Sequence, residues 1–278
     1  MKMKQDVYLG MRQGDLVGKP YAKYWKPEMG SLQPQVQDAV LHGKYASELG
    51  IELEQADELL KPGYLPLESG ITKLASGKYL IACLTQMPKL TGEMFEWWMG
   101  WHYMEAQRYK LWHPQAHLDN GTSEMQGDNP ELSNREKYQT THYVHEYMGD
   151  SATKIAITFS PASEYFRSVD NPYSDEVTAL VCGRISIRRP ALTIGHVIHQ
   201  IRQVDDGAEM RSRFWMGRPK FSAYSNKDLR NRIVSSRLIS DAAMPTNFAR
   251  NLLVHCGMEM NHLSGFLPDL FADYNPDQ

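Results

Sequence analysis

A histidine and a glutamate four residues apart, His255 and Glu259, are the pair of side chains in this 278-residue sequence that most clearly suggests chemistry. They lie within residues 248–263, where apolar residues recur every three or four positions and predict a helix. On that helix the two side chains are neighbours, roughly 6 Å apart along the axis. The face they share is otherwise apolar, so both should be buried. A buried carboxylate is costly unless a base, a hydrogen-bond network or a metal ion compensates it.

Two ligands one helical turn apart are a common beginning of a metal site, and a hydrogen-bonded His–Glu pair in the core is the alternative. The choice depends on whether other elements supply further ligands. Glu146 is a candidate, because in a predicted strand at 138–148 it shares one face with the apolar Val144. The same alternation in a predicted strand at 195–204 directs His199 inward.

Three further histidines could complete such a site. His113 ends a predicted helix beside Pro114, and His117 lies in the polar loop that follows, so spacing alone does not choose between them. His262, on the C-terminal helix, is a candidate ligand or a residue that lines a pocket. Two histidines with two glutamates are harder ligands than the cysteines of structural zinc sites. The set therefore favours a catalytic divalent ion, above all zinc, with room for water or a substrate.

The elements that must position these residues are short helices, then antiparallel strands, then one long helix. Before residue 74, frequent proline and glycine keep the elements short. The pattern of apolar residues predicts, in order, helices at about 34–48 and 53–60, a strand at 78–84, a helix at about 90–110, a polar loop at 115–121, a surface loop at 121–137, strands at 138–148, 155–159, 178–187, 195–204 and 209–215, and a basic loop region at 218–240 before the C-terminal helix.

This order of elements is typical of an α+β protein. A curved antiparallel sheet wrapped around a long C-terminal helix fits it, and such a sheet leaves a cavity between itself and the helix. We therefore predict two domains: a small N-terminal domain of helices and loops at 1–74, and a metal-binding catalytic domain at 75–278.

Composition restricts the partners and the compartment. The net charge of −3 gives no reason to expect nucleic acid or an anionic membrane as a partner, and no apolar run is long enough to cross a bilayer. The N-terminus lacks the apolar segment of a secretory signal. Each of the three cysteines, Cys83, Cys182 and Cys256, lies in an apolar context, which indicates buried thiols and a cytoplasmic protein.

The sequence also lacks the motifs of several large enzyme classes. It contains no phosphate-binding Walker loop, no dinucleotide-binding glycine fingerprint, no Gly-x-Ser-x-Gly elbow and no His-Glu-x-x-His pair. These absences argue against nucleotide-dependent enzymes, serine hydrolases of the α/β type and zincin proteases.

Two motifs resemble one known family. The segment 108–117, Arg-Tyr-Lys-Leu-Trp-His-Pro-Gln-Ala-His, followed by Asn120, resembles the 2,4-diacetylphloroglucinol hydrolase and phloretin hydrolase family. So does His255-x-x-x-Glu259, shortly before a Phe-Leu-Pro tripeptide. Enzymes of this family cleave the carbon–carbon bond between an acyl group and a polyhydroxylated aromatic ring. Their catalytic domain resembles the Bet v1-like helix-grip fold and follows a small N-terminal domain. The likeness covers roughly residues 75–270.

The resemblance implies a zinc ion held by two histidines and two glutamates. Carried over residue by residue, the ligands in this chain are His117, Glu146, His255 and Glu259. The resemblance therefore selects His117 over His113, a choice that spacing leaves open.

The resemblance also implies residues that contact the substrate. Tyr109 and Asn120 match positions that hold the substrate's oxygens. His199 matches an inward histidine near the catalytic centre, which we expect to protonate the ring carbon. A substrate-binding tyrosine of the family falls near Phe214 and Trp215 here. Because a hydroxyl is lost at that position, we expect the preferred substrate to differ.

The implied function is zinc-dependent hydrolysis of an acylphloroglucinol such as 2,4-diacetylphloroglucinol, with release of a carboxylic acid such as acetate, by a homodimer. Two alternatives stay open. One is a helix-grip protein that binds a hydrophobic ligand without catalysis, in which His255 and Glu259 are a buried pair. The other is a metal-dependent enzyme that acts on another aryl or cyclic ketone, including an oxygenase that uses iron. Metal content and turnover without oxygen distinguish these functions.

Overall fold

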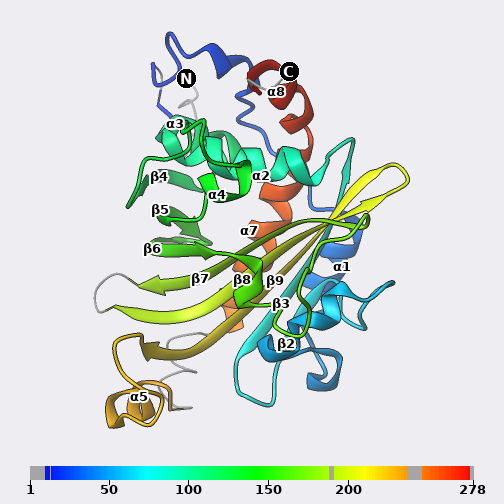
Figure 1. Ribbon diagram of the computed structural model, residues 1–278, viewed down its shortest axis with the longest axis vertical. Helices are drawn as coiled ribbons and strands as arrows, with labels where there is room; N and C mark the ends of the chain where they lie inside the picture. Colours follow the sequence, from blue (N-terminus) through cyan, green and yellow to red (C-terminus); the bar gives the residue numbers. More distant parts are fainter. Residues whose placement is uncertain (1–9, 13, 188–190, 237–245, 276–278) are drawn as a thin grey trace, which may run out of the picture.

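A single curved sheet forms the body of the protein in the computed structural model, which describes residues 10–12, 14–187, 191–236 and 246–275 (Figure 1). Within these residues the sheet has nine strands in the order β1-β2-β3-β9-β8-β7-β6-β5-β4. All neighbours are antiparallel except β1 and β2, which are parallel. The strands are β1 (Lys44–Tyr45), β2 (Gly70–Lys73), β3 (Tyr79–Pro88), β4 (His117–Thr122), β5 (Thr141–Met148), β6 (Ser151–Ser160), β7 (Val177–Ile187), β8 (Leu192–Val204) and β9 (Gly207–Phe221).

The longest described helix, α7 (Thr246–Ser264), lies against the inner face of the sheet, where it contacts β2, β3, β5 and β9. Figure 1 shows α7 running behind the strands, with α2 and α3 over one end of the sheet. The other helices are α1 (Pro34–His42), α2 (Gly92–Trp101), α3 (Ala106–Trp112), α4 (Asn134–Lys137), α5 (Leu229–Val234) and α8 (Leu267–Tyr274), with 3-10 turns η1 (Pro20–Tyr24), η2 (Ser47–Leu49), η3 (Leu53–Leu60), η4 (His102–Met104) and η5 (Ala162–Glu164). The predicted α+β architecture, a curved antiparallel sheet around a long C-terminal helix, is confirmed.

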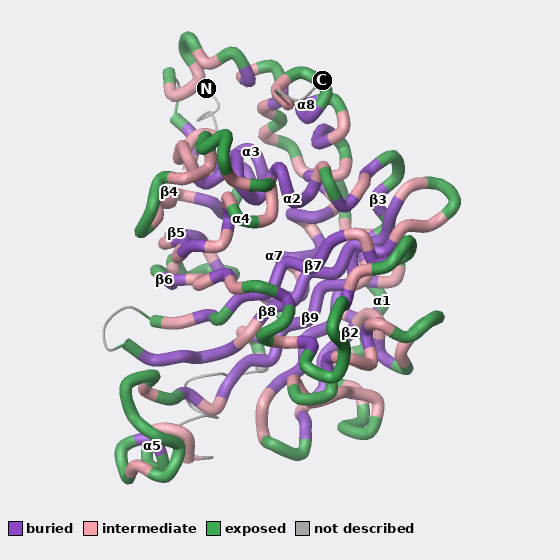
Figure 2. The backbone as a smooth tube through the Cα atoms, in the orientation of Figure 1, coloured by how far each residue is buried: buried purple, intermediate pink, exposed green. Residues whose placement is uncertain are grey.

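Alternation along the central strands divides the core into two parts. On β8 and β9, Val197 and Phe214 point to the inner face and belong to the apolar cluster that includes α7. Their neighbours Ile198 and Trp215 point to the outer face, where apolar side chains from residues 45–67 cover them. Figure 2 shows these strands buried along most of their length, as expected for a sheet covered on both faces.

Several predicted elements have other boundaries, among them the surface loop predicted at 121–137, which ends in α4, and three more have an evident cause. The helix predicted to run to residue 48 ends at His42, because Gly43 adopts a φ of +91°, outside the helical range. The helix predicted at 90–110 is two helices, because Glu105 is extended, with φ −150°, between η4 and α3. The polar loop predicted at 115–121 is largely strand β4, which the pairing with β5 holds in place.

The basic region predicted as a loop at 218–240 is more ordered than expected. Its first residues are the end of β9, and α5 follows. Asp228 caps α5 by accepting a hydrogen bond from the Arg230 backbone. The part of the prediction that covers 237–240 lies outside the described residues.

The boundary predicted after residue 74 falls in the turn between β2 and β3. The segment before it therefore adds β1 and β2 to the edge of the same sheet, and its turns cover the outer face. Among the described residues, no helix combines the length and the apolar character needed to cross a membrane.

Candidate metal centre

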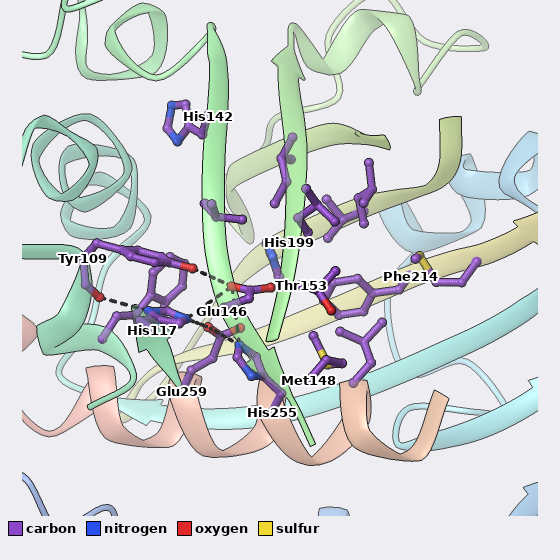
Figure 3. Close-up of a pocket in the computed structure, with 18 of the residues that line it drawn as sticks. Tyr109, His117, His142, Glu146, Met148, Thr153, His199, Phe214, His255 and Glu259 are labelled. Carbon is purple, nitrogen blue, oxygen red and sulfur yellow. Dashed lines mark hydrogen bonds and ion pairs between the residues drawn. The ribbon is translucent and has the colours of Figure 1, made fainter. Parts of the chain in front are cut away.

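Four buried side chains from three elements converge between the sheet and α7 (Figure 3). His117 comes from β4, Glu146 from β5, and His255 and Glu259 from α7. The register pairs His117 directly with Glu146, so both side chains leave the same face of the sheet. One turn of α7 brings the other two side chains together.

The distances within this cluster are short and similar. Glu259 Oε2 lies 3.5 Å from Nε2 of both His117 and His255. Glu146 Oε2 lies 3.6 Å from His117 Nε2 and 3.9 Å from His255 Nε2. Ligands held about 2.0–2.1 Å from a tetrahedral ion lie roughly 3.3–3.4 Å from one another. The spacing is therefore close to what a tetrahedral ion requires, and His117, His255 and Glu259 form a buried group that could hold a metal.

One hydrogen bond of the His117 side chain leaves its other nitrogen free to bind a metal. Its Nδ1 lies 2.9 Å from the Tyr109 carbonyl oxygen, which can only accept, so Nδ1 carries the proton. Nε2 then presents a lone pair to the cluster, and this buried atom has no hydrogen-bond partner among the described residues. An unpaired buried nitrogen is costly, and a metal ion would satisfy it.

The two residues on α7 are strongly coupled. Burial alone would lower the pKa of His255, but the charges of Glu259 and Glu146 outweigh it and raise that pKa to about 9. Burial would raise the pKa of Glu259, but His255 and His117 lower it well below its ordinary value. The carboxylate therefore stays ionised in the protein interior, as a hard metal ligand must.

Tyr109 supports two of the four candidate ligands. Its hydroxyl donates a hydrogen bond to Glu146 Oε2 at 2.5 Å, and its ring stacks on His117 with centroids 3.8 Å apart. Burial and then the charge of Glu146 raise the pKa of Tyr109 well above its ordinary value, so the phenol stays neutral and can donate. The predicted contact between the Tyr109 hydroxyl and the substrate therefore has to coexist with this hydrogen bond to Glu146.

His113 lies beside the cluster without joining it. Its ring stacks on that of His255, with centroids 4.6 Å apart, and its Nδ1 is buried without a hydrogen-bond partner among the described residues. Burial and then the neighbouring imidazoles lower the pKa of His113 to about 2, so it stays neutral. It therefore supports His255 sterically.

His117 and His113 can be distinguished by the metal content of their alanine variants. His117→Ala should lose most of the bound metal, because it removes a nitrogen that lies 3.5 Å from Glu259 Oε2 and 3.6 Å from Glu146 Oε2. His113→Ala should keep most of it, because only ring packing against His255 is lost. Elemental analysis of both purified variants, beside their melting curves, measures this. Retained metal in His117→Ala with loss in His113→Ala would reverse the assignment.

A mainly apolar cavity opens from the cluster between the sheet and α7. Besides the four converging residues, it is lined by Met99, His102, Tyr109, Trp112, His142, Val144, Met148, Thr153, Ile155, Ile157, Phe159, Ile185, Ile194, Val197, His199, Phe214, Met216, Phe248 and Leu252. A concave, largely apolar site with a few convergent polar groups is typical of a small-molecule site.

His199 lies in the wall of this cavity, as the alternation of β8 predicted. Its Nδ1 is 2.8 Å from the Ser212 hydroxyl, and its ring meets Phe95 and Phe214 edge to face. Nδ1 is thus engaged, which leaves Nε2 as the nitrogen available to a ligand. Burial lowers the pKa of His199 to about 4, so the ring is neutral at pH 7.

Three predicted site residues lie elsewhere. Trp215 points to the outer face, where its Nε1 donates to the Ile51 carbonyl at 2.8 Å, because adjacent strand residues face opposite sides. Asn120 does not line the cavity, since its amide donates to the Tyr103 carbonyl and attaches β4 to η4. His262 lies beyond the cavity on α7, with its ring edge against Phe266 at 5.6 Å.

Sequence reasoning missed three polar residues that line the cavity, His102, His142 and Thr153, and also Ser212, whose hydroxyl bonds to His199. The rings of His102 and His142 lie 5.9 Å apart. His142 could have been found, because it shares its face of β5 with Glu146 at an even spacing. His102 and Ser212 carried no such signal, because their places depend on the break between α2 and α3 and on pairing between distant strands.

Comparison with known proteins points to one family. Residues 49–272 match the family model of the DAPG hydrolase PhiG domain. The chain is 30% identical to 2,4-diacetylphloroglucinol hydrolase of Pseudomonas protegens, over 94% of this chain and 87% of that protein, and 29% identical to a 2,4-diacetylphloroglucinol hydrolase of another Pseudomonas, over 94% and 90%. It is 26% identical to phloretin hydrolase of Eubacterium ramulus, over 91% and 89%.

One solved structure that the chain resembles is that of the protein Ara h 8.0201. The crystal structure of Ara h 8.0201 covers 64% of this chain and 98% of its own, with 9% sequence identity and a TM-score of 0.30.

Proposed function

Because the chain belongs to the DAPG hydrolase family and is therefore a hydrolase of carbon–carbon bonds, we propose that it removes the acyl group from an acylphloroglucinol with the help of a zinc ion. The observation that carries the proposal is the cluster of two imidazoles and two carboxylates at the wall of an apolar cavity. A polyhydroxylated aromatic ketone is a flat, partly apolar molecule, which such a cavity suits.

The residues that would hold zinc are His117, Glu146, His255 and Glu259. Nitrogen and carboxylate oxygen are ligands that zinc accepts readily, and a site without cysteine is typical of catalytic zinc. A bound zinc ion would lower the pKa of water toward about 7 and polarise the acyl carbonyl.

Side chains of the protein would accept and donate the protons of the reaction. The apolar wall excludes bulk water, which strengthens each polar contact within the cavity. His199 Nε2, neutral at rest, accepts a proton from the water that attacks the acyl carbon and returns it to the ring carbon as the carbon–carbon bond breaks. The ring leaves as an enolate-type carbanion that its hydroxyl groups stabilise. The products are a carboxylic acid and a ring with hydrogen in place of the acyl group, so water is the only co-reactant.

Incubation with a panel of acylphloroglucinols and simple aryl ketones tests this proposal. Mass detection should show release of the carboxylic acid and of the deacylated ring from the acylphloroglucinols. A hydrophobic ligand carrier would bind members of the panel and return them unchanged. An iron oxygenase would consume oxygen and stop under anaerobic conditions, whereas hydrolysis should continue.

A substitution at Tyr109 tests whether its hydroxyl matters to the centre. Tyr109→Phe removes the hydrogen bond to Glu146 but keeps the ring on His117. We expect metal affinity to fall about 10–100-fold, the usual effect of losing a group that orients a ligand. Competition with a chelator measures this. Tyr103→Phe is the matched control, since its hydroxyl donates to the Lys137 carbonyl outside the cavity. Equal metal affinity in the Tyr109→Phe variant and the native protein would contradict the role.

A further inference from the structure

The cavity has two chemically different parts, on either side of the cluster of four candidate metal ligands. Strand β5 runs from His142 through Glu146 to Met148, and all three side chains line the cavity. Figure 3 shows His142 on one side of Glu146, and Met148 with Phe214 on the other. The cluster therefore lies between a part that contains His142 and a part that contains Met148.

The part beyond Met148 extends along α7. The Met148 carbonyl accepts a hydrogen bond from the Asn251 side chain at 3.5 Å, which places this end of β5 beside the early turns of α7. From those turns Leu252 and Phe248 line the cavity. Phe248 precedes His255 by seven residues, so the lining continues about 10 Å along the helix from that candidate ligand.

Thr153, which pairs with Glu146 in the register, lies between Glu146 and Phe214 in Figure 3 and borders this part of the cavity. Four apolar residues define what we call the apolar arm: Met148, Phe214, Phe248 and Leu252. The side chains that can pair with ring hydroxyls lie on the other side, where the His102 ring has its centroid 5.9 Å from that of His142 and 6.0 Å from that of Tyr109. A hydroxylated ring placed in the apolar arm would lose its hydrogen bonds with water and gain none, which is costly.

We propose that the preferred substrate carries an extended apolar acyl group, of about six to eight carbons, which fills the apolar arm while the hydroxylated ring faces His102 and His142. This inference rests on the proposed function, because the acyl carbon must lie at the cluster of four candidate metal ligands. An acetyl group ends one carbon beyond the reacting carbon, so it would leave the apolar arm without contacts. Each methylene that enters such a space gains transfer and dispersion energy.

A series of monoacylphloroglucinols with acetyl, butanoyl, hexanoyl and octanoyl groups tests the inference, because all of them release the same phloroglucinol. We expect kcat/KM to rise about fourfold per added methylene up to about hexanoyl or octanoyl. A kcat/KM for the acetyl compound equal to or above that for the hexanoyl compound would contradict the proposed role of the apolar arm, but it would not contradict the proposed hydrolysis. No phloroglucinol from any member would overturn the proposed function itself, and this inference with it.

Two substitutions at Leu252 locate the effect. Leu252→Trp adds bulk to the apolar arm and should lower the ratio of hexanoyl to acetyl kcat/KM at least tenfold. Leu252→Ala adds space and should move the optimum to a longer chain. Ile157→Phe, which adds bulk beside His142, is the matched control and should leave the ratio unchanged. Ratios within one preparation do not depend on the folded fraction. An unchanged ratio in both Leu252 variants would contradict the inference.

Discussion

Glu259→Gln should reduce the bound metal to less than about a tenth of the native content and lower the hydrolysis rate by roughly 10³ or more, because it removes a charged ligand that lies 3.5 Å from both candidate imidazoles. The substitution keeps the shape of the side chain, so packing between α7 and the sheet changes little. Elemental analysis and steady-state kinetics on the same preparation measure both effects.

The matched control for this prediction is Glu96→Gln. Glu96 is also a buried carboxylate, but it pairs with Arg135 at 2.9 Å and does not line the cavity. Its loss should leave metal content and rate near native values. If Glu259→Gln retained a full complement of metal, the cluster would not be a metal site, and His255 and Glu259 would be a hydrogen-bonded pair in the core.

A second large effect is expected far from the cavity, in stability. Glu68 accepts hydrogen bonds from Arg211 at 2.6 Å and from Arg213 at 2.5 Å, and both arginines on β9 are fully buried. Glu68→Ala would leave two buried guanidinium groups without their carboxylate. Removing one partner of a buried ion pair typically costs about 3–5 kcal/mol. We expect the melting temperature to fall by roughly 10 °C.

Glu58→Ala is the control for this prediction. Glu58 pairs with Lys61 at 2.7 Å on the surface, where both side chains are well exposed, so its loss should change stability little. The Glu68 variant should keep its metal while folded, because Glu68 lies on the outer side of the sheet. A melting temperature within a degree or two of native would show that water reaches the two arginines and replaces the carboxylate.

The ion pairs of Glu68 with Arg211 and Arg213 also predict that part of the protein's stability is lost in acid. Burial alone would raise the pKa of Glu68, but Arg213 and Arg211 outweigh it and lower that pKa. A carboxyl with a depressed pKa in the folded state contributes stability above its unfolded pKa and loses it as the pH falls through the folded value. The difference in unfolding free energy between the native protein and Glu68→Ala should therefore be full at pH 7 and shrink below about pH 4.5. Urea titrations across that range measure it.

The parts of the site that the sequence predicted best are those set by local periodicity. Helical spacing placed His255 and Glu259 on one face, and strand alternation directed Glu146 and His199 inward. Both patterns depend only on neighbouring residues, so they survive without knowledge of the fold. The family resemblance added His117, which no local pattern could separate from His113.

The parts that it predicted poorly depend on contacts between distant segments. Strand β4 has a polar sequence that resembles a loop, and only its pairing with β5 makes it a strand. The resemblance implies that Asn120 contacts the substrate, but its side-chain amide donates a hydrogen bond to the Tyr103 carbonyl, 17 residues away. The resemblance places a substrate-binding position near Phe214 and Trp215, but alternation on a strand directs these two side chains to opposite faces. That difference could have been predicted from the sequence.

We propose that a metal bound by His117, Glu146, His255 and Glu259 supports hydrolysis of a carbon–carbon bond. The most direct test of this proposal is anaerobic incubation of the metal-analysed protein with 2,4-diacetylphloroglucinol in water enriched in oxygen-18. We predict about one zinc per chain, acetate that carries one labelled oxygen, and an equal amount of the monoacetyl product, all lost when a chelator removes the metal. Acetate without the label, or equal turnover by metal-free protein, would contradict it.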